Sequence, residues 1–390
     1  MRKVAVVGVG NSKFGVRSDV NVAELAFEAV KPSIDNAGVD TKDIEYVAVG
    51  TVGAGAWYEE PLPAVVVAEY CGLTKAGLAR VEAACASSSA AFSSAYSAVA
   101  SGQVDVAMAV GVEKMREVDT PTAVELIGRG GYYLWEFHNF GLTFPGYYAL
   151  HATAHMAKYG TTEEDLAAVA VKNHKYASMN PLAHLQNKIT IDDALSSMVI
   201  ASPLKLYDCC PLTDGASSVI VAAEEKVKEL KVDTPIWVAG IGFSSGTANL
   251  SKRPDYVGLE ASVIAGQMAF KKAGVTVDQI DVAEVHDCFT IAEIMAYEDL
   301  GLCKKGEGGK LVREGQTEIG GKIPVNVDGG LKAKGHPIGA TGCSMIYELT
   351  KQLREEAVQK ERQVPMKNYI ALAHNVGGTG HYCYVTILKR

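Results

Sequence analysis

The chain has 390 residues and carries 37 lysines and arginines against 45 aspartates and glutamates, which gives a formal net charge of −8. Its 48% hydrophobic and 21% charged residues are typical of a globular protein and exclude an intrinsically disordered one. The acidic balance argues against nucleic acid or an anionic membrane surface as a partner. Composition therefore indicates a globular protein that binds neither nucleic acid nor a membrane.

The opening sequence MRKVAVVGVGNSKFG is too rich in glycine, and its apolar run too short, for a signal peptide. No stretch approaches the roughly 18 apolar residues of a membrane span. The 8 cysteines are scattered and include no Cys-x-x-Cys pair, which is typical of reduced thiols and argues against structural zinc. We therefore expect a cytoplasmic protein with no metal and no covalently bound cofactor.

The period of the apolar residues alternates between that of strands and that of helices, which predicts the α/β class. The first helical pattern ends at Gly38, a residue type that commonly terminates helices. The elements expected in the first half are, in chain order, a strand at 4–9, a helix at 22–37, a strand at 44–49, a strand at 79–84, a helix at 86–101 and a strand at 104–110.

The second half of the chain repeats this order, with a strand expected at 236–241, a helix at 261–273 and a strand at 280–285. The segment AGVDTKDIEYVAVG of the first half matches AGVTVDQIDVAEVH of the second at one constant offset, and the opening strands lie four residues away from that offset. Such a repeat predicts a duplicated α/β unit, with two similar domains packed across a pseudo-twofold axis.

Between the halves lies a segment rich in aromatic residues and poor in strand signals, residues 117–204. An insertion of this length inside a duplicated core is typical of a lid or a ligand-binding subdomain, and it is equally consistent with a helical subdomain that has its own aromatic core. The expected division is an N-terminal half at 1–116 and 205–233, the insertion, and a C-terminal half at 234–390.

Cys85 is the first residue that could carry chemistry. It follows an apolar strand and opens a small-residue helix in the sequence EAACASSSAA. The positive end of the helix dipole favours the thiolate, so this position predicts a nucleophile. A buried cysteine that acts as a small hydrophobe is the alternative.

The sequence HDCF supplies a second candidate pair, His286 and Cys288, at the end of the strand expected at 280–285 and before a helix expected at 290–300. In α/β proteins the carboxyl ends of strands carry the functional sites. Both side chains could therefore point into one pocket, although a satisfied core histidine and a buried cysteine would fit the pair taken alone.

Two glycine-rich segments complete the set of candidates. KGHPIGATG presents His336 in a tight turn before a helix that starts near Ala340, because the glycines permit the turn and Pro337 fixes the backbone at the position after His336. HNVGGTG follows a strand expected at 369–373, and its glycines leave backbone N–H groups free to form an oxyanion hole.

Two other patterns are weaker. GVGNSKFG has Lys13 where a dinucleotide-binding fingerprint needs its third glycine. His151 and His155 have the spacing of zinc ligands on a helix, but no glutamate lies in the required position and no third ligand is near in the sequence. Neither pattern predicts a site.

The four segments, in this order and at these separations, resemble the thiolase superfamily over essentially the whole chain. The resemblance implies two duplicated halves that form a five-layered αβαβα core, with the insertion as the loop domain that holds coenzyme A. HDCF, HMAKYG, KNHKYASMNP and CCPLTDGAS resemble the sterol-carrier-protein type and the archaeal acetyl-CoA acetyltransferases. In that type Cys288 inherits the acid/base role that two-cysteine thiolases give to a cysteine at the position of Asn375.

The resemblance implies an acetyl-CoA C-acetyltransferase that condenses two acetyl-CoA to acetoacetyl-CoA and feeds hydroxymethylglutaryl-CoA and mevalonate synthesis. Cys85, as a resting thiolate activated by its helix and by His336, would form an acetyl-enzyme. Cys288 would then remove the α-proton of a second acetyl-CoA, whose enolate is held by His336 and by a water on His286. The other residues implied are the backbone N–H groups of Cys85 and Gly377 as the oxyanion hole, and Tyr147, Tyr148, Leu150, Cys210 and Asn375 at the substrate.

Coenzyme A thioesters are thus the expected substrates, and bulky residues at the acyl group would favour short chains. The resemblance also implies a homodimer or homotetramer, with hydroxymethylglutaryl-CoA synthase and a small zinc-ribbon/OB-fold bridging protein as partners. Two other functions remain open: a degradative 3-ketoacyl-CoA thiolase for longer chains, and a non-catalytic scaffold that binds acyl-CoA. Decarboxylative condensation, as in ketoacyl synthases, fits the motifs less well.

Overall fold

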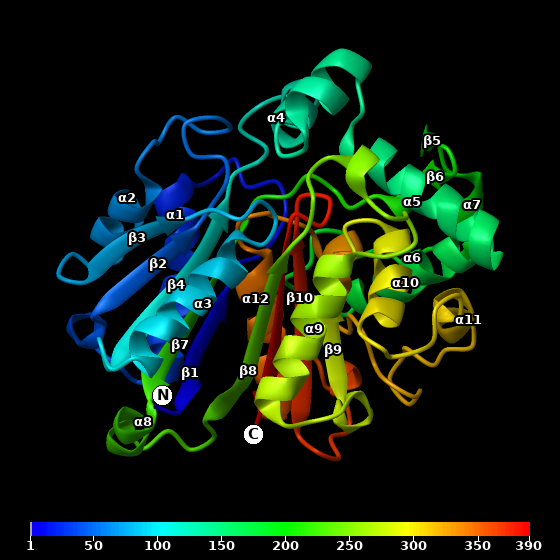
Figure 1. The fold of residues 1–390 in the computed structure, drawn as a ribbon. Helices are drawn as coiled ribbons and strands as arrows, with labels where there is room; N and C mark the ends of the chain where they lie inside the picture. Colours follow the sequence, from blue (N-terminus) through cyan, green and yellow to red (C-terminus); the bar gives the residue numbers. More distant parts are fainter. Residues whose placement is uncertain (1) are drawn as a thin grey trace.

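The computed structural model describes residues 2–390 (Figure 1). Within this range a 9-stranded sheet has the order β3-β2-β4-β7-β1-β8-β11-β10-β9. Its strands are β1 (Val4–Asn11), β2 (Tyr46–Gly50), β3 (Gly77–Val81), β4 (Val106–Glu113), β7 (Gly215–Ala223), β8 (Ile236–Ser245), β9 (Val282–Val285), β10 (Ile370–Gly377) and β11 (Tyr382–Lys389). A small second sheet pairs β5 (Val199–Ala201) with β6 (Leu204–Lys205).

The helices begin and end where local signals place them. Asn21 caps the first helix in a capping box with Glu24, and Gly38 ends that helix with a φ of 64°, in the left-handed region that glycine adopts readily. The helices are α1 (Val22–Ala37), α2 (Pro63–Tyr70), α3 (Ser87–Ala100), α4 (Thr120–Gly128), α5 (Phe144–Tyr159), α6 (Glu163–Ala177), α7 (Ile191–Ser196), α8 (Glu224–Leu230), α9 (Glu260–Ala273), α10 (Thr290–Asp299), α11 (Gly308–Arg313) and α12 (Thr341–Leu353).

The sheet shows the duplication that the sequence predicts. The order β2-β4-β7-β1 in one half corresponds to β9-β10-β11-β8 in the other, and the halves meet where β1 pairs with β8 over two residue pairs. A Cβ atom on Gly10 would lie 2.0 Å from the carbonyl oxygen of Ala29, and one on Gly242 would lie 1.9 Å from that of Ala265. The close approach of strand to helix is thus repeated. The connection from β8 to α9 is four residues longer than that from β1 to α1, which accounts for the shifted offset of the opening strands.

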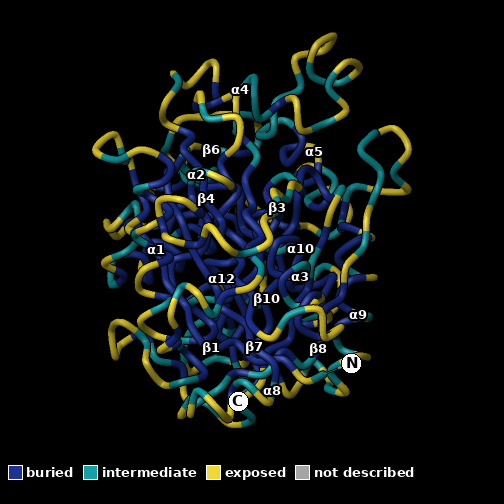
Figure 2. The backbone as a smooth tube through the Cα atoms, turned by 90° about the vertical axis from the view of Figure 1, so that its left-hand side faces the viewer, coloured by how far each residue is buried: buried dark blue, intermediate teal, exposed yellow. Residues whose placement is uncertain are grey.

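Alternate residues of each strand face different helical layers. In β4, Ala107 and Ala109 belong to the same core cluster as Phe92 of α3, whereas Met108 belongs to the cluster that contains Leu25 of α1. Helix α12 contacts both β7 and β10, and α9 covers β8 and β11. The α3/α12 layer therefore lies between the halves, which agrees with the five-layered core, and burial is continuous through it (Figure 2).

The insertion is mostly helical, as expected, and contributes α4 to α7 and the two short strands. In Figure 1, α4 stands at one end of the molecule, whereas α5 and α6 lie beside α10. Buried groups join α6 to the C-terminal half: Lys172 pairs with Glu293 and donates to the carbonyl oxygen of Val325 at 2.7 Å. None of the helices in residues 2–390 combines the length and apolar character needed to cross a membrane.

Candidate active site

Cys85 lies in a tight turn between β3 and α3. The strand ends at Val81, earlier than expected, because Ala84 adopts a φ of 49°, which alanine rarely does. The Ser87 hydroxyl supports the turn: it accepts a hydrogen bond from the Ala83 N–H at 2.9 Å and donates one to the Ala84 carbonyl at 2.6 Å. The turn places Cys85 at the N-terminus of the buried helix α3, as the sequence predicts, with a relative exposure of 7%.

An apolar cavity of about 180 Å³ has Cys85, Cys288, His336, Cys210 and Gly378 in its wall; we call it the cysteine cavity. The three candidate segments around Cys85, Cys288 and His336 thus converge, although they are far apart in the sequence. The remaining lining residues are Met115, Thr120, Val124, Ile127, Phe144, Pro145, Cys209, Pro211, Leu212, Phe289 and Ile338.

His336 directs an unpaired nitrogen lone pair toward this site. Its Nδ1 lies 2.7 Å from Thr341 Oγ1, and that hydroxyl donates its proton to the Pro337 carbonyl at 3.1 Å. The hydroxyl has one proton to give, so His336 Nδ1 is the N–H and Nε2 carries the lone pair. Nε2 has no hydrogen-bond partner among the described residues. The Cys85 sulfur and one ring nitrogen each of His286 and His336 lie within 4.8 Å of one another.

His286 has the opposite polarity, and Asn375 determines it. Asn375 Nδ2 donates to the Cys85 carbonyl and to His286 Nδ1, both at 3.1 Å, while Asn375 Oδ1 accepts from the Ser89 hydroxyl at 2.8 Å. His286 Nδ1 is therefore an acceptor, and Nε2 carries the proton. This N–H has no partner within residues 2–390. One imidazole thus offers a lone pair and the other an N–H, both beside Cys85.

Electrostatics correct one expectation. Burial raises the pKa of the Cys85 thiol to about 12, although the backbone N–H of Gly378 opposes the shift. The direction of this shift is opposite to the resting thiolate expected from the helix dipole, because desolvation disfavours the charged form. Burial also lowers the pKa of His336 to about 3. The resting pair is a neutral thiol and a neutral imidazole, so Cys85 must give up its proton during attack rather than before it.

Cys288 follows β9 and is 5% exposed. Its carbonyl accepts a hydrogen bond from the Cys210 N–H at 3.0 Å, which ties the two cysteine segments together. Burial raises the pKa of the Cys288 thiol well above its ordinary value. Cys288 is therefore a second neutral thiol in the same cavity as Cys85, with Cys210 beside it.

The glycine turn presents a different residue from the one expected. Gly378 lines the cysteine cavity, and its N–H faces Cys85. Gly377 is the last residue of β10, where it pairs with Tyr382 and its carbonyl accepts from the His381 N–H at 3.1 Å. The strand continues further into HNVGGTG than the sequence indicates, so the turn and its free N–H begin one residue later than expected.

Two of the expected substrate residues lie away from the cavity. Tyr147 is buried and donates its hydroxyl to Glu136 at 2.6 Å, and Leu150 is 44% exposed. Neither lines the cysteine cavity. On α5, Phe144 and Tyr148 lie one turn apart on the same face; Phe144 lines the cavity, and Tyr148 stacks on Phe289 with ring centroids 4.6 Å apart.

Asp287, which the motif contains but sequence reasoning gave no role, positions the His336 loop. Its carboxylate accepts from the N–H groups of Leu331 at 2.7 Å and Lys332 at 3.1 Å, and from Asn173 Nδ2 at 2.7 Å. Burial, with Glu293 nearby, raises its pKa to about 8. Asp287 thus connects HDCF to the π-helical turn Gly330–Lys334 that precedes His336.

Glu113 is a buried carboxylate that sequence reasoning missed. At the end of β4 it accepts from the N–H groups of Val52 and Gly53, both at 2.9 Å, and from the Thr51 hydroxyl at 3.1 Å. Burial raises its pKa to about 7. Its position directly after an apolar strand was the available signal, since the carboxyl ends of strands carry polar functional groups in this fold class.

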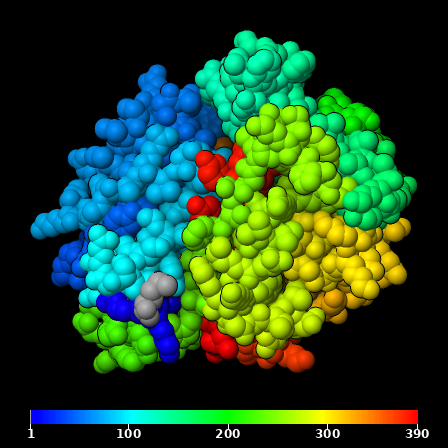
Figure 3. Space-filling model, viewed as in Figure 1, coloured from blue at the N-terminus to red at the C-terminus, as the bar shows by residue number. Residues whose placement is uncertain are grey.

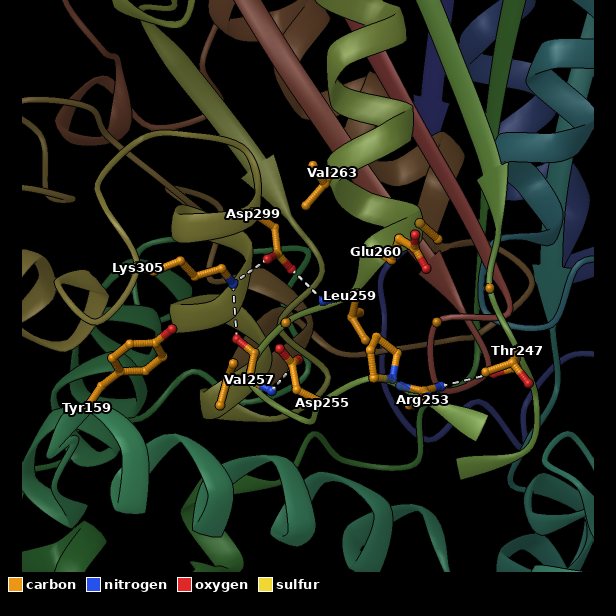
Figure 4. Close-up of a pocket in the computed structure, with 15 residues that line it drawn as sticks. Tyr159, Thr247, Arg253, Asp255, Val257, Leu259, Glu260, Val263, Asp299 and Lys305 are labelled. Carbon is orange, nitrogen blue, oxygen red and sulfur yellow. Dashed lines mark hydrogen bonds and ion pairs between the residues drawn. The ribbon is translucent and has the colours of Figure 1, made fainter. Parts of the chain in front are cut away.

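A separate cavity of about 410 Å³ lies on the other side of the glycine turn (Figure 4). Gly380 lines this cavity, whereas Gly378 lines the cysteine cavity. Between them, Thr379 accepts hydrogen bonds from Arg253 at its carbonyl oxygen and, at 3.0 Å, at its hydroxyl. Arg253 also contacts His151 Nε2 at 3.2 Å. The guanidinium thus fastens the turn that faces Cys85.

The surface is hollowed beside the C-terminal segment. In Figure 3 the C-terminal segment, red, reaches the surface in a hollow beside the blue N-terminal half. A cavity of about 460 Å³ has Ala84, Arg129, His381 and Tyr382 among its lining residues. Both flanks of the turn are therefore open, while the catalytic candidates remain buried.

Cys85, His286 and His336 form the one group in residues 2–390 whose ligand atoms are close enough to hold a metal ion. As hydrogen-bonded here, His286 directs an N–H rather than a lone pair at the other two. The arrangement therefore suits a substrate oxygen better than a cation, because a metal needs the deprotonated nitrogen.

A buried cysteine at a helix N-terminus, a neutral imidazole beside it and free donors around it define a site for nucleophilic acyl transfer. Comparison with known proteins gives the family. The family model "Thiolase, N-terminal domain" matches residues 4–225, and "Thiolase C-terminal domain-like" matches residues 242–390. The chain belongs to the thiolase family, which confirms the resemblance and the fold class.

Known relatives agree with this assignment. Acetyl-CoA acetyltransferase of Methanothermobacter thermautotrophicus is 44% identical to this chain, and the match covers 100% of both chains. Human sterol carrier protein 2 is 32% identical over 100% of this chain and 72% of its own length. A solved structure described as "Ltp2-ChsH2(DUF35) aldolase" superposes with a TM-score of 0.85 at 26% identity, covering 99% of this chain and 97% of its own. Acetyl-CoA acetyltransferase from Syntrophomonas wolfei, 19% identical with a TM-score of 0.74 and 100% coverage of both chains, shares the fold.

Proposed function

We propose that this protein is an acetyl-CoA acetyltransferase that condenses two acetyl-CoA to acetoacetyl-CoA through an acetyl group on Cys85. The observation that carries the proposal is the presence of two thiols, Cys85 and Cys288, in one apolar cavity with His336. The full-length archaeal relatives named acetyl-CoA acetyltransferase, 44% and 40% identical, support the choice of acyl group.

In the first half-reaction Cys85 Sγ attacks the thioester carbonyl and its proton passes to His336 Nε2. The oxyanion accepts hydrogen bonds from the N–H groups of Cys85 and Gly378, each such donor contributing about 3 kcal/mol to the transition state. The tetrahedral intermediate collapses to acetyl-Cys85. The departing CoA thiolate takes the proton of Cys288, which becomes a thiolate.

In the second half-reaction the Cys288 thiolate removes the α-proton of a second acetyl-CoA. The enolate oxygen accepts from His286 Nε2–H and from the protonated His336. The enolate carbon attacks acetyl-Cys85, and Cys85 leaves as a thiolate that recovers its proton from His336. All three groups return to their resting protonation states, and one free CoA and one acetoacetyl-CoA are released.

The cavity supports short acyl groups. Its volume is about 180 Å³, and bulky apolar side chains such as Phe144, Met115 and Phe289 close it. This role falls to them rather than to Tyr147 and Leu150, which lie elsewhere. A degradative 3-ketoacyl-CoA thiolase would use the same steps on longer chains, so the rates of thiolysis for acyl groups of increasing length distinguish the two.

Mass spectrometry of the protein and its peptides after incubation with acetyl-CoA tests the function. The wild-type protein should carry one acetyl group on Cys85 that free CoA removes; Cys85→Ala should carry none. Cys288→Ala should accept the acetyl group but form no acetoacetyl-CoA. Cys71→Ala is the matched control, because Cys71 is also buried, with an exposure of 7%, but lies outside the cavity. Absence of acetyl-Cys85 would favour the non-catalytic scaffold.

The same proposal extends to assembly and cellular role. Strand β3 is one edge of the sheet, and its residues are exposed or half-buried, so a second copy could pair with it to form a homodimer or homotetramer; sedimentation measures the mass. A cytoplasmic enzyme of this kind would supply acetoacetyl-CoA to hydroxymethylglutaryl-CoA synthase on the way to mevalonate and isoprenoids. The name of the similar structure, "Ltp2-ChsH2(DUF35) aldolase", contains two components, which supports a protein partner. We propose that the partner here is a zinc-ribbon/OB-fold bridging protein, and co-purification with the synthase tests it.

A further inference from the structure

The hydroxyl of Tyr148 is buried without a partner. Tyr148 lies on α5 with a relative exposure of 1%, and its ring stacks on Phe289 at 4.6 Å and 25°. Its Oη forms no hydrogen bond with any residue that the structure describes. Buried hydroxyls are normally satisfied, because an unpaired one loses its hydration without compensation.

The ring of Tyr148 stacks on Phe289, the residue after Cys288, and the hydroxyl of Tyr148 and the thiol of Cys288 influence each other's ionisation. Burial raises the pKa of the Cys288 thiol, and the Tyr148 hydroxyl partly counteracts this rise. A neutral thiol is a weak acceptor, whereas a thiolate is a strong one. The hydroxyl is therefore unsatisfied while Cys288 is protonated and becomes satisfied when Cys288 ionises.

We propose that Tyr148 is a further catalytic residue, whose otherwise unpaired hydroxyl donates a hydrogen bond to the Cys288 sulfur only when that sulfur is a thiolate. The role rests on the proposed function, in which Cys288 acts as base in the second half-reaction. Tyr148 stabilises the charged base, which forms when Cys288 gives its proton to the departing CoA. An interaction made only in the reactive state accelerates its step, whereas one made equally in both states does not.

Tyr148 keeps its own proton throughout. Burial and the neighbouring Cys288 hold the pKa of its hydroxyl well above the ordinary value. The proton that leaves Cys288 goes to the departing CoA, and the proton that returns comes from the α-carbon of the second acetyl-CoA. Tyr148 therefore donates a hydrogen bond without exchanging its proton.

The substitution Tyr148→Phe removes the hydroxyl and retains the ring that stacks on Phe289. Tyr147→Phe is the matched control: it is the next residue on α5, equally buried, and its hydroxyl bonds to Glu136 outside the cavity. Each protein is treated with iodoacetamide at one fixed pH, and alkylation of the Cys288 peptide is followed by mass spectrometry. The rate follows the thiolate fraction.

We expect Tyr148→Phe to slow alkylation of Cys288 about tenfold, which corresponds to about 1.4 kcal/mol, and Tyr147→Phe to leave the rate unchanged. Looser packing would raise access and speed the reaction, so a decrease distinguishes the proposed role from a structural one. Condensation should also slow about tenfold, because it uses the same Cys288 thiolate as its base.

An unchanged alkylation rate in Tyr148→Phe would overturn the proposal. A normal alkylation rate combined with slow condensation would also overturn it, because the hydroxyl would then act on the substrate instead. Alkylation needs no acyl-CoA, so it tests Tyr148 even if wild-type Cys85 fails to acetylate, an outcome that would count against the proposed function alone.

Discussion

Replacing Asn375 by aspartate should reverse the polarity of His286. Asn375 is 1% exposed, and its Nδ2 donates to both the Cys85 carbonyl and His286 Nδ1 at 3.1 Å. A carboxylate in its place can only accept. His286 would then carry its proton on Nδ1 to meet the carboxylate, and Nε2 would face the site as a lone pair instead of an N–H.

The magnitude follows from the hydrogen bonds that the substitution removes. The enolate loses one positioned donor, and removal of such a donor typically costs about 100- to 1000-fold in kcat. The Cys85 carbonyl loses its hydrogen bond and faces a carboxylate oxygen, which costs about 1–3 kcal/mol of stability. Asn375→Asp should therefore slow condensation at least about 100-fold and lower the free energy of unfolding by at least about 1 kcal/mol.

Condensation is followed by the formation of acetoacetyl-CoA, and stability by urea unfolding. Asn36→Asp is the control, because Asn36 uses its carbonyl oxygen to accept from Arg354 at 2.9 Å and from the Val9 N–H at 3.1 Å, and a carboxylate keeps both bonds. If Asn375→Asp condenses within threefold of the wild-type rate, the assignment of the His286 tautomer and its role is refuted.

Two further predictions concern groups around the site. Arg253→Lys removes the guanidinium nitrogen that donates to both the carbonyl and the hydroxyl of Thr379. Acetylation of Cys85, followed by mass spectrometry, should therefore slow about tenfold. An unchanged rate would show that the glycine turn does not depend on these hydrogen bonds. Burial raises the pKa of Glu113 from 4.5 to about 7, so the folded state binds a proton that the unfolded chain releases, and stability from this group falls as pH rises from 4.5 to 7. Urea unfolding should show wild-type stability falling by about 3 kcal/mol relative to Glu113→Gln over that interval, and parallel curves would contradict it.

Much of the fold could be read from short-range signals. Gly38 and Gly274 end equivalent helices at φ values of 64° and 65°, and the matching segments that run from these helix ends through β2 and β9 revealed the duplication. The placement of Cys85 at a strand-to-helix turn was also local. These features depend on residues within a few positions of one another, so the sequence carries them directly.

The site itself could be predicted only as a set of residues. Sequence periodicity alone did not separate Tyr148, which faces Phe289, from Tyr147 and Leu150 on the same helix. The strand ended at Gly377, four residues beyond the expected point, and Gly378 rather than Gly377 faces Cys85. Both outcomes depend on what packs against the element, and neighbours distant in the sequence decide that.

The sequence by itself determined the elements, their duplication and which thiols and imidazoles are available, because capping, periodicity and turn chemistry act over a few residues. The tertiary structure alone decided their chemical states. Burial in the assembled core raises the pKa of the Cys85 thiol, and His286 presents an N–H because Asn375, on β10, donates to its other nitrogen. Protonation and tautomer depend on burial and on partners brought together by folding.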